Sequence, residues 1–320
     1  MFTLTDDRSA KGAELRVVFV STLDSLMDED DRVVMLEADL GGASGSTKLQ
    51  ATHPDRFIQC GISEANMIGV AAGMSSEGFR PFVHSFGPFA SRRVFDQIFL
   101  SGAYAHNTVN IYGSDPGFCV GTNGGTHTTL EDVALMRAVP GAVICDAADA
   151  VQCEWIIRTF ARLEGVHYLR CNRKAVRNVY GVGSTFELGK GNILREGSDV
   201  LIIAAGQIVS EALDAAEMLV DDGISAEVID MFCIKPLDKE LVLSEAAGKK
   251  AVVTFENHGN TGGLGESVAS TLLEGGVSVP FRRHGIAEQF GQVGSPDYLQ
   301  KVFRLTAEDL LKTVEELLDS

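Results

Sequence analysis

The sequence predicts an α/β protein with two doubly wound α/β domains. Short apolar runs alternate with helix-length amphipathic stretches along most of its 320 residues, and this alternation is typical of βαβ units that build a largely parallel sheet. Several runs are β-branched and apolar on both faces, as a sheet covered on both sides requires. The chain is also longer than one hydrophobic core usually supports, which favours two domains.

The first domain is expected to contain five strands and four helices. The strand-like runs are 33–36, 82–83, 109–112, 142–145 and 167–169. The stretches with helical periodicity are 64–76, 89–104, 130–139 and 151–163. The pattern weakens between residues 173 and 185, where Gly181, Gly183 and Ser184 interrupt it. We therefore place a domain boundary near residue 185.

The second domain, residues 186–320, resumes the alternation seen in residues 1–185. Its expected strands are 200–205, 226–229 and 251–255, and its expected helices are 210–220, a stretch after Gly265, and 307–318. Thr306 and Asp309 form a variant capping box before the last of these helices. The second domain is thus predicted to be a further α/β unit.

Composition and charge exclude several classes of function. The net charge is −17 and the basic residues form no runs, so nucleic acid and anionic membrane surfaces would repel the chain. Residues 1–7 lack the features of a signal peptide, and the longest apolar run, 200–205, is too short to cross a bilayer. Six cysteines are scattered without a CxxC pair. They are typical of free thiols in a reducing compartment, so we expect a cytoplasmic protein.

The most informative segment joins a strand to a helix at residues 59–74. It reads Gln-Cys-Gly-Ile-Ser-Glu-Ala-Asn-Met-Ile-Gly-Val-Ala-Ala-Gly-Met. Gly61 would end the strand, and Ser63 would cap a helix that begins at Glu64. Small residues along this helix would let another backbone approach closely. A lone glutamate at such a place could simply interact with the helix dipole, which contributes about 0.3–1 kcal/mol.

Two further segments place aromatic and polar residues after strands. Phe86 and Phe89 follow strand 82–83 and could form an apolar slot for a flat heterocycle, although each could also be an ordinary core residue. The loop 124–127, which ends at His127, comes after strand 109–112. Loops beyond the strands of an open α/β sheet commonly carry function. His127 is therefore a candidate site residue.

Together these segments resemble the pyrimidine-domain signature of transketolases, G-I-x-E-x-x-M-x-G-x-A-x-G, followed by F-x-x-F and a G-x-T/S-H turn. The resemblance runs from near Arg8 to the end of the sequence. It implies thiamine diphosphate as cofactor and Glu64 as the catalytic glutamate, which hydrogen-bonds N1′ of the aminopyrimidine and promotes loss of the C2 proton. Phe86 and Phe89 match the pair that encloses the pyrimidine ring. Asp39, in an Ala-Asp-Leu segment that lines the family's site, is a further cofactor-binding candidate.

The resemblance also implies substrate-binding residues, some of which depart from the family pattern. His127 matches a catalytic histidine that contacts the donor sugar, and Arg170 matches an arginine that holds the sugar phosphate. Asn123 stands where ordinary transketolases have aspartate, Ser114 stands in place of a histidine, and Ser44 is a weaker substrate contact. These departures imply an unusual sugar, modified or differently phosphorylated. The implied reaction transfers a two-carbon ketol unit from a ketose to an aldose.

Half of the family's cofactor site is missing from this sequence. Relatives hold Mg²⁺ and the diphosphate with a G-D-G motif and a downstream Asn on another domain, and no Gly-Asp-Gly occurs here. Because Mg²⁺ needs several oxygen ligands, the resemblance implies an N-terminal, diphosphate-binding transketolase subunit as partner, which supplies the metal ligands. The expected assembly is α2β2, and this chain alone would be inactive.

Three other functions stay open. The β subunit of a 2-oxo acid dehydrogenase shares the architecture, although Ser-Gln typically follows its matching histidine, where this chain has Thr128 and Thr129. A relative of 1-deoxyxylulose-phosphate synthase would accept pyruvate as donor. A non-catalytic scaffold would keep only the dimer interface. A Glu64→Gln variant assayed with the partner would separate the scaffold from an enzyme.

Overall fold

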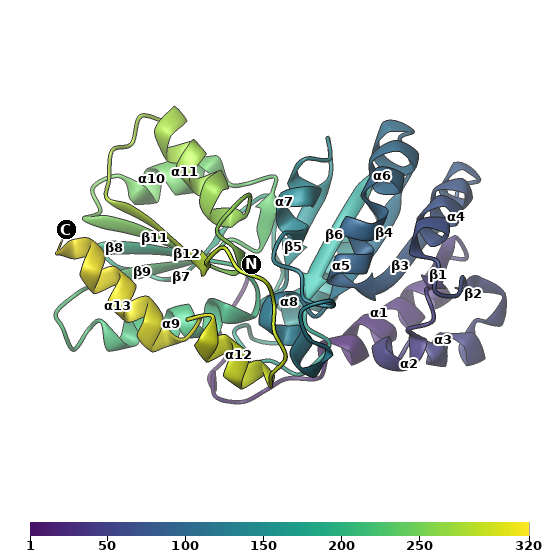
Figure 1. The fold of residues 1–320 in the computed structure, drawn as a ribbon, viewed down its shortest axis with the longest axis horizontal. Coiled ribbons are helices and arrows are strands. Elements are labelled where there is room, and N and C mark those ends of the chain that lie inside the picture. The colour runs from purple at the N-terminus through teal and green to yellow at the C-terminus, as the bar shows by residue number, and fades with distance from the viewer. Residues whose placement is uncertain (320) are drawn as a thin grey trace.

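The computed structural model describes residues 1–319 and confirms the expected fold class, because two mixed but mainly parallel sheets lie next to each other, each between layers of helices (Figure 1). The seven-stranded sheet has the order β10-β5-β6-β4-β3-β1-β2, and the five-stranded sheet has the order β12-β11-β8-β9-β7. Each sheet has one antiparallel edge strand, β10 in the larger and β7 in the smaller.

All the strands expected from the sequence are present. The larger sheet consists of β1 (Val33–Glu37), β2 (Phe57–Gln59), β3 (Arg80–Phe86), β4 (Val109–Ser114), β5 (Val143–Asp146), β6 (Val166–Cys171) and β10 (Cys233–Lys235). The smaller sheet consists of β7 (Asn192–Arg195), β8 (Val200–Ala204), β9 (Ala226–Asp230), β11 (Ala251–Gly259) and β12 (Phe281–Ile286). Strand β2 is the one that Gly61 was expected to end, and the three strands that the sequence did not predict, β10, β7 and β12, are the other edges of the two sheets.

Helices of the larger-sheet half are α1 (Leu15–Glu29), α4 (Glu64–Ser76), α7 (Asp132–Arg137) and α8 (Ala150–Phe160), with short turns α2 (Gly41–Ser44), α3 (Thr47–Thr52), η1 (Pro54–Arg56) and η4 (Gly117–Asn123). Those of the smaller-sheet half are η5 (Gly206–Ile208), α9 (Val209–Met218), α10 (Lys239–Ala246), α11 (Leu264–Glu274), α12 (Pro296–Val302) and α13 (Ala307–Leu318). Within residues 1–319, no helix is both long and apolar enough to span a bilayer.

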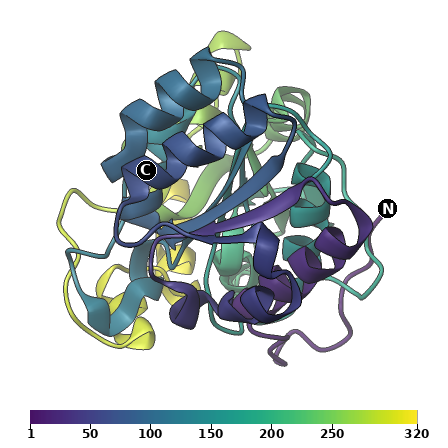
Figure 2. The same cartoon turned by 90° about the vertical axis from the view of Figure 1, so that its right-hand side faces the viewer.

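Each sheet buries both of its faces. Val34 and Leu36 of β1 belong to the core beneath α4 and α7, whereas Val33 and Met35 belong to the core beneath α1 and α8. In the smaller sheet, α10 and α11 cover one face, and α9 and α13 cover the other (Figure 1). Figure 2 shows the same two-sided cover of the larger sheet from its end. Two-sided burial explains why the central strands are apolar at consecutive positions.

The prediction of one continuous helix over residues 89–104 is wrong. The chain there forms four short pieces: α5 (Gly87–Ala90), η2 (Arg92–Val94), α6 (Phe95–Gln97) and a π-helical η3 (Ile98–Tyr104). The break falls at Ser91, whose φ of −126° and ψ of −78° are not helical and whose buried hydroxyl donates to the carbonyl of Gly87. This side-chain bond offers the backbone an alternative to the helix.

The domain boundary expected near residue 185 stays a prediction. Backbone segments from each side of it pair with the other side. Strand β10 comes from the second half of the chain but pairs with β5 in the larger sheet. The amino-terminal segment runs along the connection between the halves, with bridges from Leu4 to Tyr180 and from Lys11 to Arg177. The two halves are therefore joined by backbone pairing as well as by packing.

Candidate cofactor and substrate site

The parallel strands of the larger sheet bring their carboxyl ends to one edge, and the segments beyond them carry most of the candidate residues. Asp39 follows β1, Glu64 follows β2, Phe89 follows β3, Asp115 follows β4 and Arg173 follows β6. Residues from five connections therefore meet at one place. Ligands of open α/β sheets bind outside the carboxyl ends of the strands, so this edge is the candidate site.

Glu64 is the buried carboxyl of the site. The chain turns from β2 into α4 at Gly61, whose φ of +68° is easily adopted only by glycine. Glu64 then begins α4 with only 4% of its surface exposed. Its Oε1 accepts a 2.8 Å hydrogen bond from Arg93 and lies 3.5 Å from the hydroxyl of Ser85. Ser63 precedes the helix as expected, but its side chain makes no capping bond.

Three aromatic rings pack together at this edge, and Arg93 links one of them to the Glu64 carboxyl. Phe86 and Phe89 meet edge to face with centroids 6.4 Å apart, and the ring of His127 lies 5.5 Å from Phe86 and 5.0 Å from Phe89. The guanidinium of Arg93, which binds Glu64, also lies 3.9 Å from the centroid of the Phe89 ring. A planar nitrogen-rich group can therefore contact the Phe89 face and the carboxylate at the same time.

The loop that carries His127 depends on two glycines. Gly124 has a φ of +76°, and a Cβ on Gly125 would lie only 2.3 Å from the carbonyl oxygen of Gly291. Glycine is therefore required for the turn and for close contact with the segment before α12. Thr126 then hydrogen-bonds Nδ1 of His127 over 3.0 Å. The ring is held from both sides, by Thr126 and by the two phenylalanines.

Two predicted substrate residues are buried instead. Ser44 donates to Oε1 of Glu37 over 2.6 Å, and Ser114 bonds Nε2 of His84 over 3.0 Å, while Nδ1 of that ring bonds Glu37. All four side chains are completely buried. Burial would raise the pKa of Glu37, but the charge of His84 and these hydrogen bonds bring it below its usual value. The prediction that Ser44 and Ser114 contact substrate is therefore wrong, because their polar atoms serve this internal network.

Arg170 is also wrongly assigned to substrate. Its side chain is 1% exposed, and its guanidinium donates to Asp132 over 2.8 Å, to Asp146 over 2.7 Å and to the carbonyl of Asn257 over 2.6 Å. Burial raises the pKa of Asp146 to about 6 despite the nearby Arg170 charge. Each nitrogen of this buried guanidinium already donates to the protein, so Arg170 joins the two halves of the chain rather than binding a sugar phosphate.

Arg173 is the arginine that the structure places at the site. Its guanidinium lies 4.7 Å from the centroid of the Phe86 ring and donates to Asp115 over 2.6 Å. Burial raises the pKa of Asp115, an effect that the charge of Arg173 opposes. Arg173 was not among the site residues predicted from the sequence. The available signal was its position just beyond the end of β6, where side chains leave the sheet.

Two more predicted residues lie exposed at this edge. Asp39 has a φ of +61°, and its backbone N–H donates to Gln59. Asn123 ends η4, four residues before His127. Within residues 1–319, the side chains of Asp39 and Asn123 make no hydrogen bond or ion pair, and no group of three or more His, Cys, Asp or Glu side chains could hold a metal ion. The structure leaves both residues available to a ligand.

Two doubly wound α/β halves, with a buried carboxyl and paired phenyl rings at the carboxyl edge of one sheet, define an α/β protein with a candidate ligand site. The family model for the transketolase pyrimidine-binding domain matches residues 11–179, and the model for the transketolase C-terminal domain matches residues 189–310. The chain belongs to the transketolase family, whose members depend on thiamine diphosphate.

Similar proteins include both separate subunits and longer enzymes. The 6-deoxy-6-sulfo-D-fructose transketolase subunit SqwH of Clostridium sp. (strain MSTE9) is 44% identical over 303 residues, which are 95% of this chain and 94% of that protein. The 1-deoxy-D-xylulose-5-phosphate synthase of Heliobacterium modesticaldum is 34% identical over 95% of this chain but only 47% of that enzyme. A solved split-gene transketolase, described as an inactive β4 tetramer, has a TM-score of 0.87 at 37% identity and covers 96% of this chain and 99% of that one.

Proposed function

We propose that this chain is the pyrimidine-binding subunit of a two-subunit transketolase, which transfers a two-carbon ketol unit from a ketose to an aldose. The observation that carries the proposal is the buried Glu64 carboxylate, which the Arg93 guanidinium joins to the face of Phe89. A flat ring with a nitrogen aimed at Glu64 fits where the Arg93 guanidinium already makes both contacts. Thiamine diphosphate has such a ring and, when bound, supplies the electron sink that amino-acid side chains lack.

In this proposal, the chain's own residues bind the pyrimidine ring and hold a proton beside it. Glu64 holds a proton at Oε1, facing the ring nitrogen, as a positioned general acid–base group does. Phe86 and Phe89 exclude water from that contact, which strengthens the hydrogen bond. Arg93 has to leave Glu64 when the ring binds, and its position in the short turn η2, with 45% of its side chain exposed, allows this.

A second polypeptide completes the site in this proposal. The surface of α4 and its neighbour η3 carries exposed apolar side chains, since Ile62, just before α4, is 76% exposed, Tyr104 of η3 is 77% exposed, and η3 packs against α4. Exposed apolar groups of this kind mark contact surfaces. We infer that the diphosphate-binding subunit covers this face in an α2β2 assembly and supplies the Mg²⁺ ligands. The free state of all six cysteines supports a cytoplasmic location.

The substrate in this proposal is a sugar with an anionic group. Arg173 and His127 flank the aromatic pair, and Asn123 is exposed beside them. Arg173 is suited to a tetrahedral anion because a guanidinium can donate two parallel hydrogen bonds. A phosphate or a sulfonate would meet this requirement, and the name of the relative that acts on 6-deoxy-6-sulfo-D-fructose makes sulfonated ketoses a reasonable choice of test substrate.

A Glu64→Gln variant tests the proposal. With the partner subunit and thiamine diphosphate present, ketol transfer should fall at least about 100-fold, since a positioned general acid–base group contributes 10²–10⁴-fold. Glu77→Gln is the matched control, because Glu77 is exposed just beyond the other end of α4. An unchanged rate for Glu64→Gln would exclude a catalytic role for Glu64 and favour the hypothesis of a non-catalytic scaffold. Turnover with pyruvate but not with ketoses would instead indicate a synthase-like or dehydrogenase-like donor specificity.

A further inference from the structure

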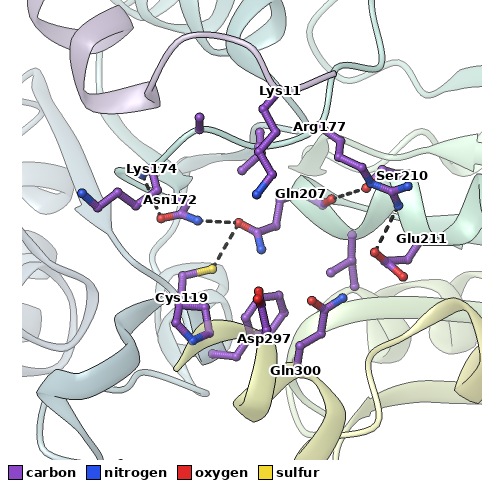
Figure 3. Close-up of a pocket in the computed structure, with 15 residues that line it drawn as sticks. Lys11, Cys119, Asn172, Lys174, Arg177, Gln207, Ser210, Glu211, Asp297 and Gln300 are labelled. Atoms are coloured by element: carbon purple, nitrogen blue, oxygen red, sulfur yellow. Dashed lines mark hydrogen bonds and ion pairs between the residues drawn. The ribbon is translucent and has the colours of Figure 1, made fainter. Parts of the chain in front are cut away.

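A cavity lies between the two halves of the chain, and Glu64 is not among the residues that line it. It has a volume of about 320 Å³ and is lined by the amino-terminal segment, the connection after β6, the start of α9, α12 and η4 (Figure 3). Cavities of roughly 300–1,000 Å³ hold small organic ligands. None of the residues that form the candidate cofactor and substrate site lines it.

The cavity lies where the smaller sheet is expected to bind a ligand. From β8 the chain passes through α9 to β9 on one side, whereas β11 lies on the other side of β8. The strand order therefore reverses at β8, and ligands of open α/β sheets bind in the crevice beyond such a point. Gln207 and Ser210, which follow β8 directly, line the cavity, and Cys119 of η4 contributes from the other half.

The cavity offers free hydrogen-bond donors on one side. Gln207 uses its side-chain oxygen to accept from Asn172 over 2.9 Å and from Cys119 over 3.2 Å, which turns its amide nitrogen toward the cavity (Figure 3). The Lys11 ammonium points toward the same centre (Figure 3). Within residues 1–319, neither that ammonium nor the Gln207 amide nitrogen has a hydrogen-bond partner or a counter-ion. An anionic acceptor would satisfy both.

The opposite side offers free acceptors. Gln300 donates its amide nitrogen to the carbonyl of Leu305 over 2.9 Å, so its side-chain oxygen is the group left over. Asp297, at the start of α12, is exposed, and its carboxylate forms no ion pair with any residue in 1–319. By contrast, Arg177 is already paired, with Asp214 over 2.5 Å and with Glu211 over 3.1 Å. One unpaired cation and one unpaired anion therefore face each other across the cavity.

We propose that this interdomain cavity binds a small amino acid, with the ligand's carboxylate at Lys11 and Gln207 and its ammonium group at Asp297 and Gln300. A zwitterion places opposite charges against opposite charges, whereas a phosphate or a dicarboxylate would leave Asp297 facing a like charge. Because the lining residues come from both halves of the chain, the ligand would bridge them.

The test is isothermal titration of the purified full-length chain with each proteinogenic L-amino acid, followed by the deaminated acid and the decarboxylated amine of the best ligand. We expect saturable one-to-one binding that weakens about tenfold or more when either charged group is missing, as for a hydrogen bond to a charged group. Neither the partner subunit nor thiamine diphosphate is needed, so the result does not depend on the proposed ketol transfer.

Two variants locate the site, and a third serves as control. Lys11→Met and Asp297→Asn should each weaken binding about tenfold, whereas Lys239→Met, which removes another exposed lysine on the far α10, should not change it. Both replaced side chains are exposed, so the variants should fold normally, which circular dichroism checks. The proposal is overturned if no amino acid binds, if the deaminated acid binds equally well, or if both variants bind like the unaltered chain.

Discussion

Two arginines three residues apart, Arg170 and Arg173, have opposite environments. Arg170 is enclosed between two carboxylates and a carbonyl, whereas Arg173 is 15% exposed and lies over an aromatic ring. Replacement of the two should therefore differ in effect. Loss of Arg170 should affect stability, whereas loss of Arg173, which also leaves the buried Asp115 without its partner, should lower stability and weaken recognition of an anionic substrate.

Arg173→Met is expected to raise KM for an anionic ketose by roughly 10- to 100-fold, because a hydrogen bond between charged groups contributes about 1.5–3 kcal/mol. The value of kcat should change only a few-fold, since the variant leaves Glu64 and the two phenylalanines in place. Steady-state kinetics of the reconstituted enzyme with an anionic and an uncharged ketose checks this. A similar loss with the uncharged ketose would contradict the assigned role.

Arg170→Met is expected to lower the free energy of unfolding by about 3–5 kcal/mol, because Asp132 and Asp146 would remain buried without their partner. Urea unfolding at neutral pH measures the change. Arg162→Met, at an exposed position after α8, is the control and should lie within about 0.5 kcal/mol of the unaltered chain. Equal stability of the Arg170 and Arg162 variants would show that the ion pairs contribute nothing net.

The sequence could identify Glu64, Phe86, Phe89 and His127 as candidates because each belongs to a local pattern at the end of a strand or the start of a helix. It could not separate Arg170 from Arg173, since both occur at the end of one strand and only the packing of the second half over β6 buries the first. Likewise, Ser44 and Ser114 became internal only because Glu37 and His84 lie between them. These contacts join residues up to 47 positions apart in the chain.

At the scale of elements, the loop before His127 is held by its contact with the segment before α12. Gly125→Ala would place a methyl group 2.3 Å from the carbonyl oxygen of Gly291, so the loop would have to move. We expect kcat/KM of the reconstituted enzyme to fall about 100-fold, as for a displacement of about 1 Å near reacting groups. Gly42→Ala is the control, because a Cβ there meets nothing within 4 Å.

Element prediction succeeded where one element carried its own signals. Helix α4 begins and ends as expected because Gly61 fixes the turn before it, and α13 begins after Thr306, whose hydroxyl accepts from the N–H of Asp309. The unpredicted strands are all edges, which have one neighbour and need no continuous apolar run. Residues 89–104 have helical periodicity, but Ser91 interrupts the helix by bonding backward to Gly87.

At the scale of the whole molecule, Asp230 connects three parts of the chain. It ends β9 of the smaller sheet, accepts from Gln152 of α8 over 2.7 Å, and accepts from the hydroxyl of Tyr180 in the connection between the halves. Its side chain is completely buried. Burial raises the pKa of this carboxyl to about 7, although the two donors act in the opposite direction. The stability of the whole chain should therefore depend on pH through this residue.

The sign of this dependence follows from the raised pKa. The folded chain binds the Asp230 proton more tightly than the unfolded chain does, so the stabilising contribution is complete below pH about 4 and is lost as pH rises through about 7. Asp230→Asn keeps an oxygen for both donors but cannot ionise. The variant should already be more stable than the unaltered chain by about 1.5 kcal/mol at pH 5, and by about 4 kcal/mol at pH 8.

Urea unfolding midpoints at pH 5, 6, 7 and 8 measure this difference. Asp146, whose pKa is raised to about 6 by burial, remains in the variant and should produce a smaller residual fall over the same range. Asp222→Asn, at an exposed turn after α9, is the control and should follow the unaltered chain at every pH. If the stability of Asp230→Asn also matched that of the unaltered chain at every pH, the Asp230 carboxyl would be ionised in the folded chain from pH 5 to pH 8. Its bonds to Gln152 and Tyr180 would then outweigh the cost of burying its charge, and the junction would be insensitive to pH.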